Sequence, residues 1–260
     1  SSSISEVAKS SEIIIEAVPE RLLIKQSAYA EIESSAVKSL IIASSTSGIL
    51  PSDLQAEMQH PERLLVAHPF NPVYLLPLVE IVGGSKTSKD AIEKVTGIIT
   101  SIGMFPLHIK KEIPAFIADR LLESVWREAL WLVNDDIATT QEIDDAIRYG
   151  FGLRWAQMGL FETYRLAGGE AGMRHFISQF GPCLEWPWTH LMDVPEFTEE
   201  LIDKVSNQSD QQSGQFSIDE LMEKRDDNLV DFLKVLKDNR WGAGKTLKEF
   251  DDSLSESIIK

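Results

Sequence analysis

The feature that most limits the possible folds is the succession of short apolar runs and helical segments over residues 1–111. Five runs rich in aliphatic and β-branched residues occur there, and residues 20–35 and 88–102 between them have helical spacing. Short apolar runs that alternate with helices favour a mainly parallel sheet with helices on its faces. The predicted strands are Ile13–Ile15, Leu40–Ala43, Leu64–Ala67, Leu78–Val82 and Phe105–Ile109.

The pattern changes near residues 110–114 to one that is nearly all helical. We expect a domain boundary there, with Pro114 in the first turn of a helix over residues 114–133. The sequence therefore predicts an α/β domain over residues 1–111 and an all-α domain over residues 112–260.

Two signals define the next helix of the second domain. Thr139 and Glu142 have the spacing of a capping box, in which each side chain accepts a hydrogen bond from the other residue's backbone N–H. The helix that they open is expected to stop at Gly150 and Gly152. Further helices are predicted over residues 167–180, 196–206 and 217–238.

Charge and cysteine content narrow the function class. The chain has 41 acidic and 25 basic residues, a net charge of −16, which argues against a nucleic-acid-binding protein because phosphate contacts need a basic surface. No apolar run approaches the ~20 residues of a membrane span, and Ser1 to Ser11 lack the apolar core of a signal peptide. With Cys183 as its one cysteine, the chain forms no internal disulfide. We expect a cytoplasmic protein that binds neither membranes nor nucleic acids.

Chemically useful side chains follow two of the predicted strands. His68 opens a His-Pro-Phe-Asn-Pro segment directly after a strand, which is where ligands bind in open α/β sheets. Glu80 lies 12 residues later on an otherwise apolar strand, and Ser47 follows the strand before. A hydroxyl, an imidazole and a carboxylate could therefore meet at one edge of the sheet. The alternatives are a His68 that caps a turn, a solvated edge-strand Glu80 and a Ser47 that only forms a turn.

Two other kinds of site are disfavoured. A serine hydrolase would use the same three side chains, but the sequence has no Gly-x-Ser-x-Gly elbow. The five histidines show no metal-ligand spacing such as His-x-x-x-His, so we expect no metal site.

Several segments, in this order, resemble the 3-hydroxyacyl-CoA dehydrogenase family. They are Ala43–Gly48, His68–Pro72, Leu78–Glu80, Ile113–Leu122 and Ile143–Gly152. Longer strings resemble the L-carnitine dehydrogenase branch of that family, namely Phe151–Gly159, Ala167–Phe176, Trp186–Trp188 and Trp241–Gly244. The resemblance implies that residues 1–111 are the C-terminal part of a Rossmann-type NAD-binding domain and residues 112–260 a helical substrate and dimerisation domain.

The resemblance also implies roles for single residues. His68 would be the general base that takes the proton of a 3-hydroxyl group, Glu80 its partner, and Ser47 a hydrogen-bond donor to the substrate oxygen. The residues that match cofactor-lining positions are Ala17, Glu20, Lys25 and Asn71. The implied assembly is a homodimer, and the implied cofactor is NAD.

The chain departs from the family pattern at two places. Asp119 stands where the family has Asn, which would suit a cationic substrate such as carnitine, or would pair with Arg120 or Arg154. The Gly-x-Gly-x-x-Gly turn that binds the pyrophosphate is absent from this sequence, so we expect a fragment that lacks that N-terminal segment and binds NAD weakly on its own.

The resemblance thus implies NAD-dependent oxidation of L-carnitine to 3-dehydrocarnitine. Aromatic side chains could bind the trimethylammonium group, and Arg154 the carboxylate. The aromatic candidates are Phe151, Trp155, Phe161, Tyr164, Trp186 and Trp188, although core packing is the simpler explanation for each alone. The alternatives are a 3-hydroxyacyl-CoA such as 3-hydroxybutyryl-CoA, a sugar acid of the L-gulonate type, and a non-catalytic, crystallin-like relative.

Overall fold

The computed structural model describes residues 3–37, 39–167, 172–182 and 218–258, together with residues 189, 198–201, 203, 207 and 215. Its contacts divide the chain into two compact units. The first comprises Ser1–Arg120 and Ala243–Lys260, and the second Leu121–Gly242. The assignment of residues 1–111 to an NAD-binding domain and of residues 112–260 to a substrate and dimerisation domain stays a prediction.

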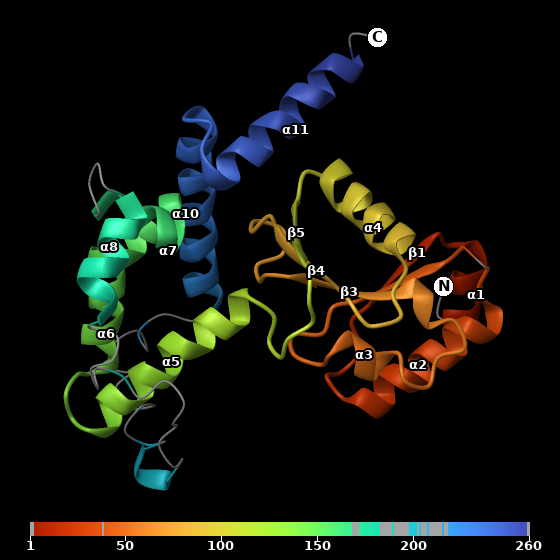
Figure 1. The fold of residues 1–260 in the computed structure, drawn as a ribbon, viewed down its shortest axis with the longest axis horizontal. Coiled ribbons are helices and arrows are strands. Elements are labelled where there is room, and N and C mark those ends of the chain that lie inside the picture. Colours follow the sequence, from red (N-terminus) through yellow and green to blue (C-terminus); the bar gives the residue numbers. More distant parts are fainter. Residues whose placement is uncertain are drawn as a thin grey trace. The chain divides into compact units, whose positions relative to one another are not determined.

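The first unit is built on a five-stranded sheet, as the alternation of apolar runs predicted (Figure 1). Its strands lie in the order β1-β2-β3-β4-β5, and all neighbours are parallel except β3 and β4. The strands are β1 (Ile13–Glu16), β2 (Ile41–Ser44), β3 (Leu64–Pro69), β4 (Leu78–Gly83) and β5 (Phe105–Ile109). The mainly parallel sheet is confirmed, and β4 is an interior strand.

Helices cover both faces of this sheet (Figure 1). Because successive strand residues point to opposite faces, the core is split into two clusters. Ile42, Leu64 and Val66 pack with α2, whereas Leu65 and Ile81 pack with α4. The helices and the short 3₁₀ turn of this unit are α1 (Ile4–Ser10), α2 (Leu22–Ser35), α3 (Pro51–Leu54), η1 (Pro61–Arg63), α4 (Lys89–Ser101) and α11 (Gly242–Ile258).

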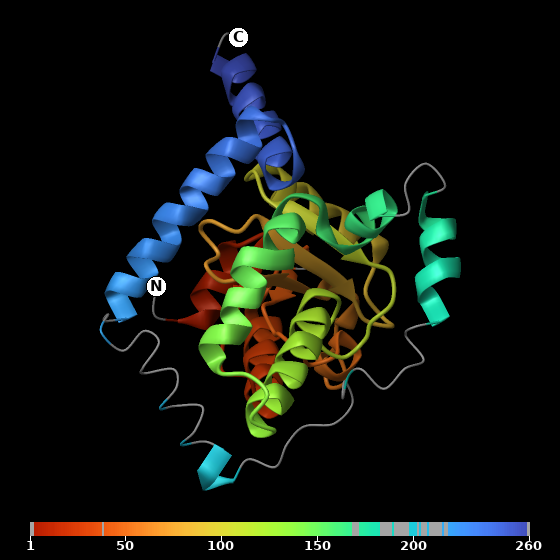
Figure 2. The same cartoon turned by 90° about the vertical axis from the view of Figure 1, so that its left-hand side faces the viewer.

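The described part of the second unit is helical, as expected. Its elements are α5 (Ala118–Asn134), which begins in the first unit, α6 (Thr140–Ala146), the π-helical segment η2 (Ile147–Phe151), α7 (Gly152–Ala167), α8 (Gly172–Phe180) and α10 (Ile218–Asp238). The helix α10 is 21 residues long and runs without interruption in both views (Figure 2). The predicted α/β unit followed by a helical unit is confirmed.

The capping box of Thr139 and Glu142 is present at the start of α6. The predicted stop after it is only partly correct. The backbone leaves helical geometry at Gly150 (φ −110°, ψ −120°), but Gly152 begins α7 rather than ending a helix. A second break lies within α7 at Gly159, whose φ of 72° is readily adopted only by glycine.

The prediction that Pro114 lies in the first turn of a helix is wrong. Helix α5 begins at Ala118, because Ala115 and Phe116 have positive φ angles of 60° and 50° and so are not helical. Trp186 and Trp188 lie outside the described residues. Parts of two predicted helices also lie outside them, namely parts of 196–206 and the start of 167–180. Among the described residues, no helix is long and apolar enough to cross a membrane.

Candidate active site

His68 and Glu80 face each other across the antiparallel pair of strands β3 and β4. They are direct register partners, and His68 Nδ1 lies 3.0 Å from Glu80 Oε2. Both side chains are buried, Glu80 completely. The alternative interpretations, a solvated edge-strand Glu80 and a His68 that caps a turn, are therefore wrong. The predicted contact between imidazole and carboxylate is present.

The charge of Glu80 determines which ring nitrogen of His68 carries a proton. Burial alone would raise the pKa of Glu80, but hydrogen bonds from His68 and from the backbone of Ala118 and Ile117 together lower it below its ordinary value. An ionised carboxylate only accepts hydrogen bonds, so His68 Nδ1–H donates to Glu80. The Nε2 atom of a neutral His68 is then the proton acceptor.

Glu80 also holds the beginning of helix α5. Its Oε1 atom accepts hydrogen bonds from the backbone N–H groups of Ile117 and Ala118, each at 3.0 Å. The positive φ angles of Ala115 and Phe116 bring these N–H groups round to the carboxylate. A carboxylate at a helix N-terminus also interacts favourably with the helix dipole. One buried side chain thus positions both the imidazole and the first turn of α5.

That first turn carries Asp119 on the other side of the imidazole. Asp119 Oδ2 lies 3.8 Å from His68 Nε2. The ring of His68 packs against Phe70 and Phe116, with ring centroids 4.9 and 5.6 Å away. His68 therefore has an apolar surround and a carboxylate near each ring nitrogen. A proton gained at Nε2 would lie between a buried and a partly exposed negative charge.

The other residues predicted for this edge follow the carboxyl ends of the parallel strands. Ala17 follows β1, Ser47 follows β2 and Asn71 follows β3, and all three are exposed. Ser47 lies in a bend, as the simpler interpretation of this serine predicted, and it stands at the same end of the sheet as His68. The arrangement leaves side-chain hydroxyl and amide groups open to a ligand lying along this edge.

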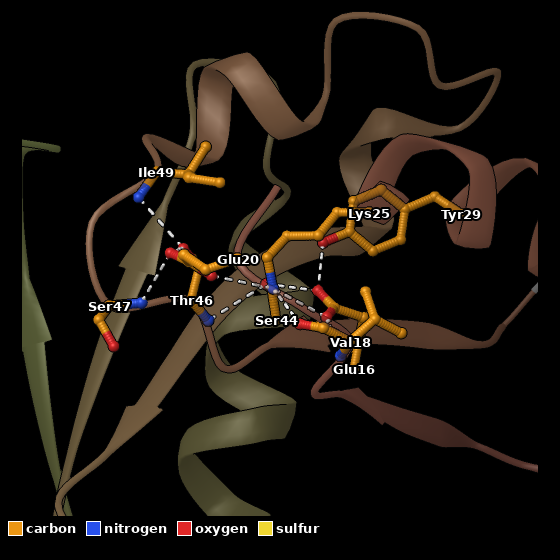
Figure 3. Close-up of polar contacts among 9 residues, drawn as sticks. All are labelled: Glu16, Val18, Glu20, Lys25, Tyr29, Ser44, Thr46, Ser47 and Ile49. Carbon is orange, nitrogen blue, oxygen red and sulfur yellow. Dashed lines mark hydrogen bonds and ion pairs between the residues drawn. The ribbon is translucent and has the colours of Figure 1, made fainter. Parts of the chain in front are cut away.

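Glu20 and Lys25 belong to a polar cluster that also contains residues not singled out from the sequence (Figure 3). Its buried centre is Glu16, which accepts hydrogen bonds from Lys25 Nζ (2.9 Å), Tyr29 Oη (2.6 Å) and Ser44 Oγ (2.7 Å). Burial works against the charge, but the bonds from Tyr29, Lys25 and Ser44 lower the pKa of Glu16. Burial, followed by the bond to Glu16, raises the pKa of Tyr29.

Sequence reasoning missed Glu16, although a signal was present. Glu16 ends a run of three isoleucines, and a carboxylate that continues an apolar strand needs hydrogen-bond partners wherever it is buried.

Among the described residues, the proposed aromatic substrate residues of the helical unit make separate ring contacts. Trp155 packs on Phe151, with ring centroids 4.5 Å apart, whereas Tyr164 stacks on Phe176 at 4.7 Å. Phe161 is largely exposed. Arg154 is also exposed and has no hydrogen-bond or ion-pair partner in the described part of the chain. Their assignment to substrate binding stays a prediction.

The helical unit contains a largely apolar cavity of about 420 Å³. It is bordered by α5, α6 and η2, with Val125, Leu132 and Ile143 among its lining residues. Phe151 reaches it, but Arg154, Trp155, Phe161 and Tyr164 do not line it. In the described ranges, no group of three or more His, Cys, Asp or Glu side chains could hold a metal ion.

Comparison with known families gives two adjacent matches. Residues 1–113 match the family described as 3-hydroxyacyl-CoA dehydrogenase, NAD binding domain. Residues 116–208 match 3-hydroxyacyl-CoA dehydrogenase, C-terminal domain. The two matches together cover most of the chain.

Curated relatives are similar over nearly the whole chain. The L-carnitine dehydrogenase of Mesorhizobium japonicum is 58% identical over 99% of this chain, which covers 72% of that protein. The L-carnitine dehydrogenase/betainyl-CoA thioesterase of Agrobacterium fabrum is 61% identical over 96% of this chain, but the chain spans only 51% of its length.

A solved structure agrees with the fold. The enzyme 5-formyl-3-hydroxy-2-methylpyridine 4-carboxylic acid 5-dehydrogenase, described as an NAD⁺-dependent dismutase, aligns with a TM-score of 0.74 at 25% identity. The alignment covers 91% of this chain and 77% of that one.

Proposed function

The chain belongs to the 3-hydroxyacyl-CoA dehydrogenase family, and on this basis we propose that it oxidises the 3-hydroxyl group of L-carnitine to 3-dehydrocarnitine with NAD. The observation that carries the proposal is the position of His68, with Nδ1 on Glu80 and Nε2 facing Asp119. The identity to two proteins named for L-carnitine dehydrogenase activity supports the choice of substrate.

His68 is the general base of the proposed reaction. Its Nε2 atom takes the proton of the 3-hydroxyl group while the C3–H bond breaks and the carbonyl forms. When bound, NAD supplies the acceptor for the hydride that leaves C3. Glu80 fixes the tautomer of His68 and stabilises the imidazolium that results, as a buried carboxylate does for a catalytic histidine. Ser47 donates a hydrogen bond to the substrate oxygen.

The residues at the carboxyl edge of the sheet fit a dinucleotide cofactor. Ala17, Glu20 and Asn71 are exposed there, and small or polar side chains allow a ribose and a nicotinamide ring to approach. The Lys25 ammonium is 1% exposed and bonded to two carboxylates, so its proposed part in cofactor binding would be indirect.

The carboxylate of Asp119 is proposed to attract the positively charged trimethylammonium group. A carboxylate beside the general base favours a cationic substrate over an anionic one. Trp155, Phe161 and Tyr164 of the helical unit are the proposed aromatic candidates for binding a trimethylammonium group, and Arg154 is the proposed candidate for binding a carboxylate. We further propose, from the family resemblance, a homodimer, and, from the single cysteine, a cytoplasmic location.

The test is NADH formation by the full-length protein with L-carnitine, a 3-hydroxyacyl-CoA and L-gulonate as separate substrates. We expect turnover with L-carnitine, and its loss in His68→Ala with an unchanged circular dichroism spectrum. Turnover with the thioester or the sugar acid alone would overturn the carnitine assignment. Turnover that survives His68→Ala would overturn the role of His68.

A further inference from the structure

Lys25 is a buried ammonium group held between two carboxylates. It lies in the first turn of α2, and its Nζ atom donates to Glu16 Oε1 at 2.9 Å and to the Val18 carbonyl at 3.3 Å. Glu20 Oε2 lies 3.2 Å from the same Nζ atom. The three donors of the ammonium group thus have three acceptors (Figure 3). This saturation leaves no donor for direct contact with a ligand.

Glu16 is the fixed end of this arrangement. It receives hydrogen bonds from α2 through Lys25 and Tyr29, from β2 through Ser44, and from the backbone N–H of Val18 at 2.7 Å. Its side chain is 2% exposed. With four donors from three parts of the fold, the Glu16 carboxylate has one position available, and it fixes the position of Lys25.

Glu20 is the other end, and it reaches the loop that carries Ser47. Its side chain is 47% exposed, yet both oxygens are bonded. Oε2 faces Lys25, while Oε1 accepts from Thr46 Oγ1 and from the backbone N–H of Ser47 at 3.2 Å. Burial opposes the charge, but the bonds from Thr46 and Lys25 lower the pKa of Glu20. Thr46 Oγ1 in turn accepts from the Ile49 backbone N–H at 3.1 Å.

We propose that Glu16, Lys25 and Glu20 act as positioning residues for Ser47. Glu16 fixes Lys25, Lys25 fixes Glu20, and Glu20 holds the backbone of Ser47 so that its hydroxyl points away from the cluster (Figure 3). The inference rests on the proposed function, which gives Ser47 its contact with the substrate oxygen.

The first test is a double-mutant cycle in the full-length protein with L-carnitine and NAD. Ser47→Ala should lower kcat/KM for carnitine about ten-fold, the effect of one lost hydrogen bond, with little change in KM for NAD. Glu20→Gln should have a similar effect, because Gln keeps the size of Glu20 but weakens its bonds to Lys25, Thr46 and Ser47. In the Ser47→Ala background, Glu20→Gln should lower kcat/KM for carnitine by less than about two-fold further.

Thr46 offers a matched pair of variants that leave Glu20 and Ser47 intact. Thr46→Val removes the hydroxyl that bonds to Glu20 and keeps the shape of the side chain. Thr46→Ser keeps the hydroxyl. We expect a lower kcat/KM for carnitine in Thr46→Val and near-normal kcat/KM in Thr46→Ser, with both variants folded. Equal activity in the two variants would count against the proposal.

Other outcomes separate this inference from the proposed function. If the losses from Glu20→Gln and Ser47→Ala multiply, Glu20 acts independently of Ser47, and the inference fails while carnitine oxidation stands. A fully active Ser47→Ala overturns the role of Ser47 together with the inference. If the wild-type protein does not oxidise carnitine, the proposed function fails. In that case, amide hydrogen exchange at Ser47 tests whether Glu20 positions this residue. Faster exchange in Glu20→Gln would support the positioning role, and unchanged exchange would overturn it.

Discussion

His68 and Glu80 are register partners in the antiparallel pair of strands β3 and β4, and their side chains meet at 3.0 Å. Opposed residues of an antiparallel pair have Cβ atoms about 5 Å apart, so the ladder itself brings the imidazole and carboxylate together. The contact thus depends on backbone pairing rather than on flexible loops. A site carried by paired strands is held more rigidly than one carried by loops.

Glu80→Gln should lower both activity and stability. The glutamine side chain could still meet His68, but it would present an amide where His68, Ile117 and Ala118 all donate to a carboxylate. We expect kcat to fall by about 10²-fold or more and the free energy of unfolding to fall by about 1–3 kcal/mol. Steady-state kinetics and urea unfolding measure the two effects.

The control for Glu80→Gln is the exposed pair of His60 and Glu62. Their side chains lie 3.5 Å apart and are about half exposed. Glu62→Gln should leave both activity and unfolding unchanged, because exposed pairs contribute little. Normal turnover in Glu80→Gln would show that the reaction does not need this carboxylate.

Glu16 should make the folded protein sensitive to acid. Its pKa is lowered from an ordinary 4.5, so its contribution to stability is complete above that pH and is lost as the pH falls through the lower folded-state value. We expect Glu16→Gln to reduce the free energy of unfolding by about 3 kcal/mol at neutral pH. The difference from wild type should shrink below about pH 4.5, as the wild-type carboxyl also becomes neutral. Urea titrations between pH 7 and pH 3 test this, and a difference that is constant with pH would contradict it.

The five strands and the helices α2 and α4 of the first unit were predictable, but α1, α3, α11 and the environment of Glu80 were not. Periodicity locates Leu78–Val82 as a strand, yet it does not give the order of strands in the sheet. Glu80 became interior because β5 pairs with the outer side of β4. A carboxylate that would be solvated at an edge is therefore buried and needs all its hydrogen bonds.

Long-range partners account for most of what sequence reasoning missed. Glu16 meets Tyr29 and Ser44, which are 13 and 28 residues away, and no local pattern joins them. The start of α5 was misjudged because Pro114 is a normal first-turn residue, and nothing local in the sequence indicates the positive φ angles of Ala115 and Phe116. His68, by contrast, was recognisable from a strand followed by a proline-bounded segment.

Asp119→Asn should change the choice of substrate. The carboxylate lies 3.8 Å from His68 Nε2, where the reacting hydroxyl must approach, and it would attract a cationic group bound there. We expect kcat/KM for L-carnitine to fall about ten-fold, equivalent to about 1.4 kcal/mol, and kcat/KM for an uncharged 3-hydroxy ester to fall less or to rise. Asp90 also lies in a helix first turn, so Asp90→Asn controls for the loss of charge at a helix N-terminus. Equal losses for both substrates in Asp119→Asn would show that the charge of Asp119 does not select the cation.

Substitutions of Trp155 test whether aromatic side chains of the helical unit bind the trimethylammonium group. Its ring packs on Phe151 but remains 37% exposed, so part of the side chain is accessible to a ligand. A cation over an indole ring contributes about 0.5–2 kcal/mol, and Trp155→Ala should therefore raise KM for L-carnitine several-fold, with KM for NAD nearly unchanged. Trp155→Phe keeps an aromatic face and should retain most of the affinity. If the Ala and Phe variants raise both Michaelis constants equally, Trp155 supports the packing of α7 and does not bind the cation.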